Sequence, residues 1–185
     1  LIATNTKIGL DEIEAVRATN DYAETGAFNP NVRAIIAYNT DSRVTPTIRS
    51  NGVLYAQVSP QGGVISGTSA VVQLDAWNWE DARVTEDGIW LNWPSMYSRK
   101  GWWGEPQGYE QNKNYDKQVK QIKDYFIQAM AYSKAPSPKK QNLRFEAMRN
   151  VFAKKHRVYV SVNYIKEIQH VLTWAKELGI SIVLA

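Results

Sequence analysis

Cysteine is absent from this sequence of 185 residues, and histidine occurs only twice. Without cysteine the chain has no disulfide bond, no thiolate zinc site and no thiol nucleophile. Two histidines cannot supply a cluster of imidazoles. His156 follows two lysines just before a predicted strand, where we expect it to be exposed, and His170 lies within a predicted helix. We therefore expect neither of them to be a metal ligand.

Long apolar runs are also missing, because none approaches the roughly 18 residues that a transmembrane helix needs. No signal peptide is recognisable, and we expect no membrane partner. The sequence begins inside a predicted strand, so we expect a processed or trimmed product, and a lost leader remains open. The absence of cysteine fits both redox environments, which leaves the localisation open between periplasmic or secreted and cytoplasmic.

The charge is unevenly distributed along the chain. Residues 1–92 hold 6 Lys and Arg against 11 Asp and Glu, whereas residues 93–185 hold 16 against 7. A basic half is one sign of a nucleic-acid-binding protein. Here the basic side chains are interleaved with acidic ones along predicted helices, which is typical of a solvated surface. We therefore predict no nucleic-acid partner and keep that function as the weakest hypothesis.

The apolar pattern predicts strands alternating with helices in a single domain, residues 1–185. The expected strands are 1–4, 53–58, 70–75, 157–163 and 180–185. The expected helices are 40–52, 113–134, 141–154 and 164–178. The strands are almost wholly apolar, which predicts a parallel sheet flanked by helices, and the last two strands with the helix between them form a βαβ unit. The Gly-rich loop SPQGGVISGTS lacks the Lys-Ser/Thr ending of a phosphate-binding loop.

Tryptophan is concentrated in residues 76–108, which hold six of the seven. We predict that this segment is a loop insertion apart from a short strand at GIWLNWP. Its rings could stack on a glycan or peptide, pack as a satellite core, or form a partner interface. Trp102 and Trp103 lie between two glycines, so we predict that this pair is exposed and binds ligand.

Three stretches resemble one family. LIATNTKIGLDEI resembles the first barrel strand of the amidohydrolase superfamily, in its imidazolonepropionase-like branch, which usually reads Pro-Gly-Leu-Ile-Asp-x-His-x-His-x-Gly. The middle match begins with NPNVRAIIAYNTDS and continues with TIRSNGVLYAQVSPQGGVISGTSAVVQL, which looks like the family's helix, Gly-Val-Thr-Thr-Val strand, Gly-rich loop and Gly-Gln-x-Ala-Val segment. NLRFEAMRNVFAKKHRVYVSVNYIKEI resembles the later strand that usually ends in His-Ala-His. The resemblance implies a metal-dependent hydrolase with a TIM barrel, acting on carbon–nitrogen bonds such as those of cyclic or dipeptide amides with zinc or another divalent metal.

The chemistry departs from that family at its histidines. Asn5 and Lys7 stand where the resemblance places the first histidine pair, and Ser161 and Asn163 stand where it places the later pair. A catalytic zinc needs neutral imidazoles at about 2.0–2.1 Å, and an ammonium group repels a dication. We therefore expect no metal ligand and no cofactor in this chain. The four residues remain candidate catalytic positions, either as a rebuilt hydrogen-bonding pocket with one cation or as a decayed site, and Lys7 is also a candidate desolvated general base.

A complete TIM barrel takes about 250 residues and eight strands, and we expect four or five barrel strands here. The predicted fold class is α/β, a partial TIM-barrel-like parallel sheet with helices and a Trp-rich loop insertion. The predicted function is that of an amidohydrolase-like protein whose hydrolysis of carbon–nitrogen bonds is altered or lost. The alternative is a non-catalytic binding module for a glycan or peptide. We expect the open sheet edges to be covered by a second copy of the chain or by the remainder of a longer chain.

Overall fold

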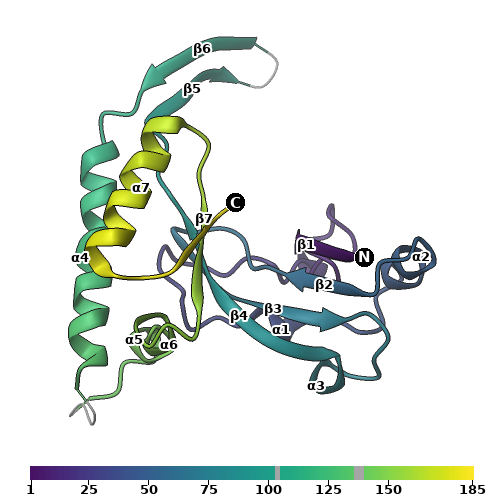
Figure 1. The fold of residues 1–185 in the computed structure, drawn as a ribbon. Helices are drawn as coiled ribbons and strands as arrows, with labels where there is room; N and C mark the ends of the chain where they lie inside the picture. The colour runs from purple at the N-terminus through teal and green to yellow at the C-terminus, as the bar shows by residue number, and fades with distance from the viewer. Residues whose placement is uncertain (103–104, 136–139) are drawn as a thin grey trace.

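A computed structural model describes residues 1–102, 105–135 and 140–185. It is an α/β fold in which a six-stranded sheet curls into a half-barrel flanked by helices (Figure 1). The strand order is β1-β2-β3-β4-β7-β8. Their bounds are β1 Ile2–Thr6, β2 Tyr55–Val58, β3 Ile65–Gln73, β4 Arg83–Asn92, β7 Arg157–Ser161 and β8 Ile182–Leu184.

The sheet is mixed, which corrects the prediction of a parallel sheet. β1 and β2 are parallel, as are β4, β7 and β8, but β3 runs antiparallel to both of its neighbours. The reason lies in the connections, since residues 59–64 and 74–82 are too few for the crossover of about a dozen residues that a parallel pair needs. The predicted βαβ unit is confirmed, because β7 and β8 are parallel and α7 (Ile165–Leu178) joins them.

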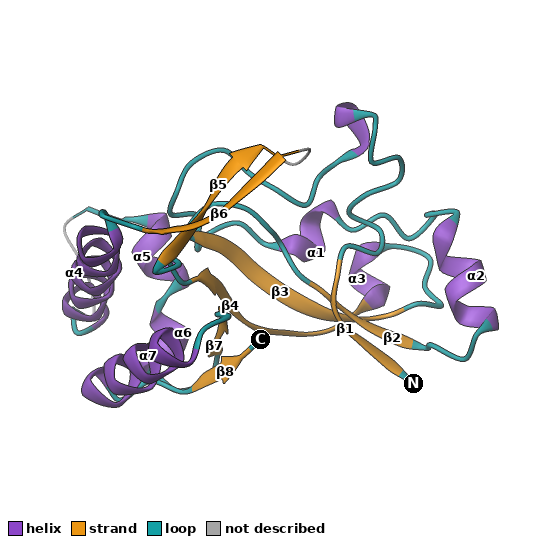
Figure 2. Cartoon of the chain, turned by 90° about the horizontal axis from the view of Figure 1, so that it is seen from above, coloured by secondary structure: helices purple, strands orange, loops and turns teal. Residues whose placement is uncertain are grey.

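The helices gather in two groups (Figures 1 and 2). The first group is α4 (Tyr115–Ser133) and α7, with α5 (Leu143–Ala147) and α6 (Arg149–Phe152), which together form the helix predicted over 141–154 as two pieces. The second group is α1 (Ala34–Ala37), α2 (Val44–Ser50) and α3 (Trp79–Ala82), and a 3-10 turn, η1, covers Arg17–Thr19. Gly179 ends α7 with a φ of 64°, as its position predicted. No helix in the described parts of the chain is long and apolar enough to cross a membrane.

Each helix group covers its own part of the sheet. The larger hydrophobic cluster joins α4, α6 and α7 to the buried side chains of β4 and β7, which are Ile89, Leu91, Val158 and Val160. The smaller cluster joins α1 and α3 to β2 and the second half of β3, through Ala56, Val58, Ala70 and Val72. In each strand the residues of these clusters are two positions apart, and residues two apart point to the same face of a strand. The helices therefore pack against one face of the sheet.

The Trp-rich segment is mostly regular structure, which corrects the prediction of a loop insertion. It contains α3, the ten-residue strand β4 in the body of the sheet, and a hairpin of β5 (Tyr97–Trp102) and β6 (Glu105–Gln111). Trp90 and Trp93 are both buried, and they lie on opposite faces of the sheet: Trp90 stacks on Tyr159 of β7, whereas Trp93 packs against Trp174 of α7. The large apolar residues on both faces hid the alternation that would have marked a long strand.

Tyr125 supplies a prediction about alkaline stability. Its hydroxyl is buried and has no hydrogen-bond partner among the described residues, and its ring stacks on Phe28 at 4.7 Å. Burial raises the pKa of Tyr125 from its ordinary 10.0 to about 12. The unfolded chain therefore ionises first, so this residue makes the protein lose stability as the pH rises from 10 to about 12. We expect Tyr125→Phe to reduce that loss in urea unfolding curves, whereas Tyr109→Phe, at an exposed position, should keep the wild-type dependence. Equal slopes for both variants would contradict the assignment.

Candidate functional site

The strand directions bring several polar residues to one edge of the sheet. β1, β2, β4, β7 and β8 run the same way, so their carboxyl ends meet at this edge, together with the amino end of β3. We call it the carboxyl edge. In barrel enzymes this edge carries the active site. Its polar residues are Asn5, Lys7, Ser59, Ser66, Asn92, Ser161 and Asn163.

At the end of β1, Asn5 is exposed and has a φ of 52°, a backbone conformation that asparagine tolerates better than most residues. The ammonium group of Lys7 has two partners within the protein. Its Nζ donates to Asp11 Oδ2 at 2.9 Å and lies 4.5 Å from the centre of the Tyr22 ring. The hydrogen bond to Asp11 raises the pKa of Lys7, with the Asp11 charge acting in the same direction. A general base needs a lysine pKa shifted down toward neutrality, so this environment keeps Lys7 a cation.

At the end of β7, Ser161 is half-buried and Asn163 is exposed. Ser161 is paired in register with Asn92 of β4, and its carbonyl oxygen accepts from Trp93 N at 3.1 Å. Strands β2, β3 and β4 lie between β1 and β7, so the two predicted pairs are separated by four strand spacings along the curled sheet. The structure therefore puts the two pairs on the same edge, and no hydrogen bond among the described residues joins one pair to the other.

The residues at these positions do not fit the metal centre that the resemblance implies. A protonated lysine has no lone pair to give a metal, and amide or hydroxyl oxygens are weak zinc ligands. Across residues 1–102, 105–135 and 140–185, no three His, Asp or Glu side chains are grouped so that they could hold a metal ion. The candidate residues at this edge offer hydrogen bonds and one positive charge.

Asn92 is a polar group at the edge whose side chain is held by hydrogen bonds, and the sequence prediction missed it. Its Nδ2 donates to Gly63 O and to Ser66 Oγ, both at 3.0 Å. Ser66 Oγ donates in turn to Gly62 O at 2.7 Å. These bonds fix the amide so that its oxygen is left as an acceptor. The signal in the sequence was the single polar residue inside the apolar run GIWLNWP.

A cavity of about 410 Å³ opens beside Asn92, between the end of β4, the start of β5 and the first turns of α4. We call it the β4 cavity. Its size lies within the range of pockets that hold small ligands. Asn112, Gln118 and Gln121 line it on the α4 side. The sequence analysis did not single out these three residues, because nothing in the local pattern distinguishes them from solvated helix positions.

The other notable polar group is a cluster on the sheet face that points away from the helices. Asp87 accepts from Gln57 Nε2 and Ser69 Oγ, both at 2.6 Å, and from the Tyr159 hydroxyl at 2.8 Å. Burial, and next the hydrogen bond to Asp87, raise the pKa of Tyr159. The cluster ties β2, β3, β4 and β7 together with its acceptors in use. We assign it to the stability of the half-barrel.

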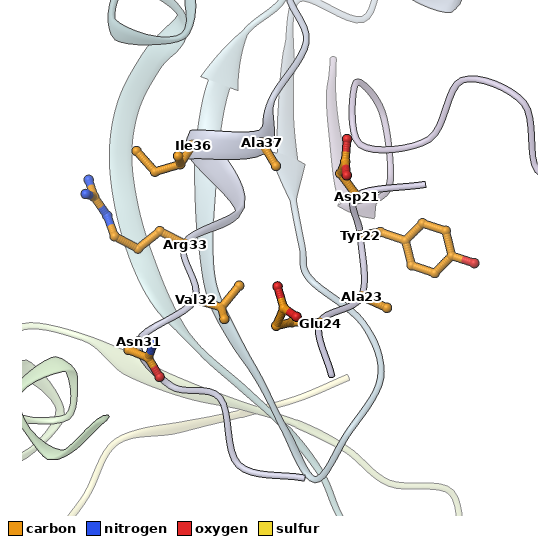
Figure 3. Close-up of a pocket in the computed structure, with 9 residues that line it drawn as sticks. All are labelled: Asp21, Tyr22, Ala23, Glu24, Asn31, Val32, Arg33, Ile36 and Ala37. Carbon is orange, nitrogen blue, oxygen red and sulfur yellow. The ribbon is translucent and has the colours of Figure 1, made fainter. Parts of the chain in front are cut away.

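Figure 3 shows a larger pocket, of about 520 Å³, between residues 21–24 and residues 31–37. Glu24 points into the space between the two segments, whereas Tyr22 and Arg33 point away from it. Arg33 is held by Glu86 through two hydrogen bonds, and Glu24 accepts from the backbone and hydroxyl of its neighbour Thr25. The carboxylates here converge on no base or nucleophile, so we assign the site to the carboxyl edge.

One of the two predicted ligand-binding tryptophans lies in the hairpin. Trp102 is the last residue of β5, and Trp103 falls outside the described residues. The segment's other tryptophans include Trp77, which is exposed, and Trp93, which lines the β4 cavity. The ligand-binding role of Trp102 and Trp103 stays a prediction.

Comparisons with known proteins give a fold relationship. No family model matches the sequence, and no curated protein matches it. The structure is similar to the crystal structure of an amidohydrolase from Thermotoga maritima MSB8, with a TM-score of 0.77 and 17% sequence identity. The similarity covers 99% of this chain and 50% of that one, so the chain spans half the length of that amidohydrolase. At this identity the likeness shows the fold.

Proposed function

We propose that this chain forms the substrate-binding half of an amidohydrolase-like barrel that handles compounds with carbon–nitrogen bonds, and that it does so without the histidine-held metal of that family. The observation that carries the proposal is the carboxyl edge, where parallel strands end in uncharged polar groups and one cation. Support for the class comes from the structural likeness to an amidohydrolase. Assignment to the imidazolonepropionase-like branch rests on the sequence resemblance of the first and middle stretches.

The residues define what this half contributes. Lys7, held as a cation by Asp11, offers hydrogen-bond donors and positive charge where the resemblance expects an imidazole ligand. Such a group binds or orients an electron-rich oxygen of a substrate, because an ammonium donates and cannot ligate. Asn92 and Ser161, in register on neighbouring strands, add neutral polar groups. Hydrolysis by this chain is therefore proposed to be altered or lost, while binding is retained.

Metal analysis tests the proposal. We expect the protein, purified without added metal, to contain far less than one equivalent of zinc, manganese or iron by plasma mass spectrometry. Added zinc should not induce hydrolysis of dipeptides or cyclic amides. The double variant Asn5→His/Lys7→His should bind zinc at least about tenfold more tightly than the wild type, because it adds two imidazoles and removes a cation. Asn5→Ala/Lys7→Ala is the control, since it removes the same groups without adding ligands.

Stoichiometric metal in the wild type, with metal-dependent hydrolysis, would overturn the proposal. A gain of zinc affinity in the alanine control equal to that in the histidine variant would show that loss of charge is the cause. A second candidate function is that of a non-catalytic binding module for a glycan or peptide through the Trp-rich segment, and it is favoured by the β4 cavity, which Trp93 of that segment lines.

A further inference from the structure

The β4 cavity is assembled from several parts of the chain. Asn92 ends β4 and Trp93 follows it, Asn112 lies three residues before the start of α4, and α4 presents Gln118 and Gln121. Gln118, Gln121 and Ile122 are three and four positions apart on α4, so they share the face that the helix turns to the cavity. The cavity therefore combines a polar wall with an apolar floor.

The polar wall is preoriented by hydrogen bonds within the protein. Asn112 Nδ2 donates to Ser95 O at 2.8 Å and to Gln118 Oε1 at 2.9 Å, and Asn112 Oδ1 accepts from Asn114 N. Because Gln118 Oε1 is occupied, its Nε2 is left as a donor. Asn92 Nδ2 is occupied in the same way, which leaves Asn92 Oδ1 as an acceptor. Gln121 makes no side-chain hydrogen bond to any described residue, so both ends of its amide are available.

The floor of the cavity consists of Phe28, Val64 and Ile122. Among the described residues, those that line the cavity include no Asp, Glu, Lys, Arg or His. An ionised ligand would therefore lose its hydration without gaining a partner of opposite charge, which is costly. The cavity fits an uncharged ligand that has both a donor and an acceptor beside an apolar group.

The unpaired polar atoms of the wall favour one class of uncharged ligand. A sugar is held chiefly by stacking on an aromatic face, and each ring at the cavity already has an aromatic neighbour: Phe28 stacks on Tyr125 at 4.7 Å, Trp93 packs against Trp174 at 5.4 Å, and the Tyr97 ring meets Tyr164 at 5.3 Å. An amide matches the acceptor and the donor that the wall leaves unpaired, because its N–H meets Asn92 Oδ1 and its carbonyl oxygen meets Gln118 Nε2.

We propose that the β4 cavity binds an uncharged amide with an apolar side chain, such as an end-blocked amino acid or peptide, through Asn92, Gln118 and Gln121. The inference rests on the proposed function for its place at the carboxyl edge, and it names the substrate class there. It predicts that ligands with free charged termini are rejected. Binding is measured separately from hydrolysis. Lack of catalysis would therefore not contradict this proposal, and lack of amide binding would not change the result of the metal analysis that tests the proposed function.

Titration with N-acetyl-leucinamide, followed by tryptophan fluorescence and calorimetry, tests the proposal. We expect N-acetyl-leucine, which carries a carboxylate, to bind at least about tenfold more weakly because its charge is desolvated without a partner. Gln121→Ala should weaken binding of the amide by about fivefold, the effect of one neutral hydrogen bond. Gln128→Ala is the matched control, since Gln128 is exposed on the same helix and outside the cavity.

Selective binding of the amide, weakened by Gln121→Ala and unchanged by Gln128→Ala, would support the proposal. Equal binding by the two variants would overturn the assignment to this cavity. Maltotriose serves as the sugar probe, and binding of maltotriose without binding of the amide would overturn the ligand class. No detectable binding of N-acetyl-leucinamide at millimolar concentration, with an unchanged circular dichroism spectrum, would overturn the proposal as a whole.

Discussion

Replacing Trp174 with alanine is expected to lower the free energy of unfolding by about 3–5 kcal/mol, the range for removing a fully buried tryptophan. Trp174 is 1% exposed at the centre of the larger hydrophobic cluster. Phe126 of α4 meets its ring edge-on at 4.8 Å, and Trp93 packs against it at 5.4 Å. Its removal would leave a cavity where α4, α7 and the sheet meet. Urea unfolding followed by circular dichroism measures the loss.

Trp77→Ala is the matched control, because Trp77 is 93% exposed. We expect its free energy of unfolding to stay within about 0.5 kcal/mol of the wild type. The comparison separates the burial of the ring from the change of residue type. Similar losses for the two variants would mean that Trp174 is not at the centre of the core.

The second large effect is expected at Gly88 of β4, which is paired with Arg157 of β7 and leaves no room for a Cβ. A Cβ added there would fall on the carbonyl oxygen of Arg157 and lie 2.8 Å from Tyr159 Cε2. The obstacle is the backbone of the neighbouring strand, which cannot move aside as a side chain does. We expect Gly88→Ala to cost about 3 kcal/mol, at the upper end for overpacking. It should also disturb the register that pairs Asn92 with Ser161.

Gly52→Ala is the control for this variant. Nothing lies within 4 Å of a Cβ at Gly52, but its φ of +83° strains an alanine. We expect a cost of about 1 kcal/mol from that strain alone. The steric argument would fail if Gly88→Ala cost no more than Gly52→Ala in the same denaturation experiment.

The elements that sequence patterns predicted correctly are those whose signals are local. The β7–α7–β8 unit follows from two apolar runs around an amphipathic helix that ends at Gly179. The fold class was also predicted in outline, as an α/β half-barrel. The direction of β3 was predicted wrongly because apolar composition favours a parallel strand, whereas the short connections on either side of β3 decide its direction.

The site was harder to predict, for a physical reason. Asn5, Lys7, Ser161 and Asn163 were singled out because the family resemblance places histidines at these positions, and the strand directions place them on the carboxyl edge. Their role stays a prediction. Asp11, the partner of Lys7, was not foreseen, because its role depends on how the loop after β1 folds back. Asn112, Gln118 and Gln121 meet Asn92 only through the packing of α4 on β4, a contact between segments that no local pattern encodes.

The reversed direction of β3 also decides which loops are free to vary. It sends the connection 59–64 to the carboxyl edge and the connection 74–82 to the opposite end of the sheet. The first connection supplies the carbonyl groups that hold Asn92, so a change in its length would disturb the binding edge. The second carries exposed Trp77 and lies across the sheet from that edge. Insertions, fused tags or whole extra modules are therefore best tolerated there, where evolution or a protein engineer could add surface without touching ligand recognition.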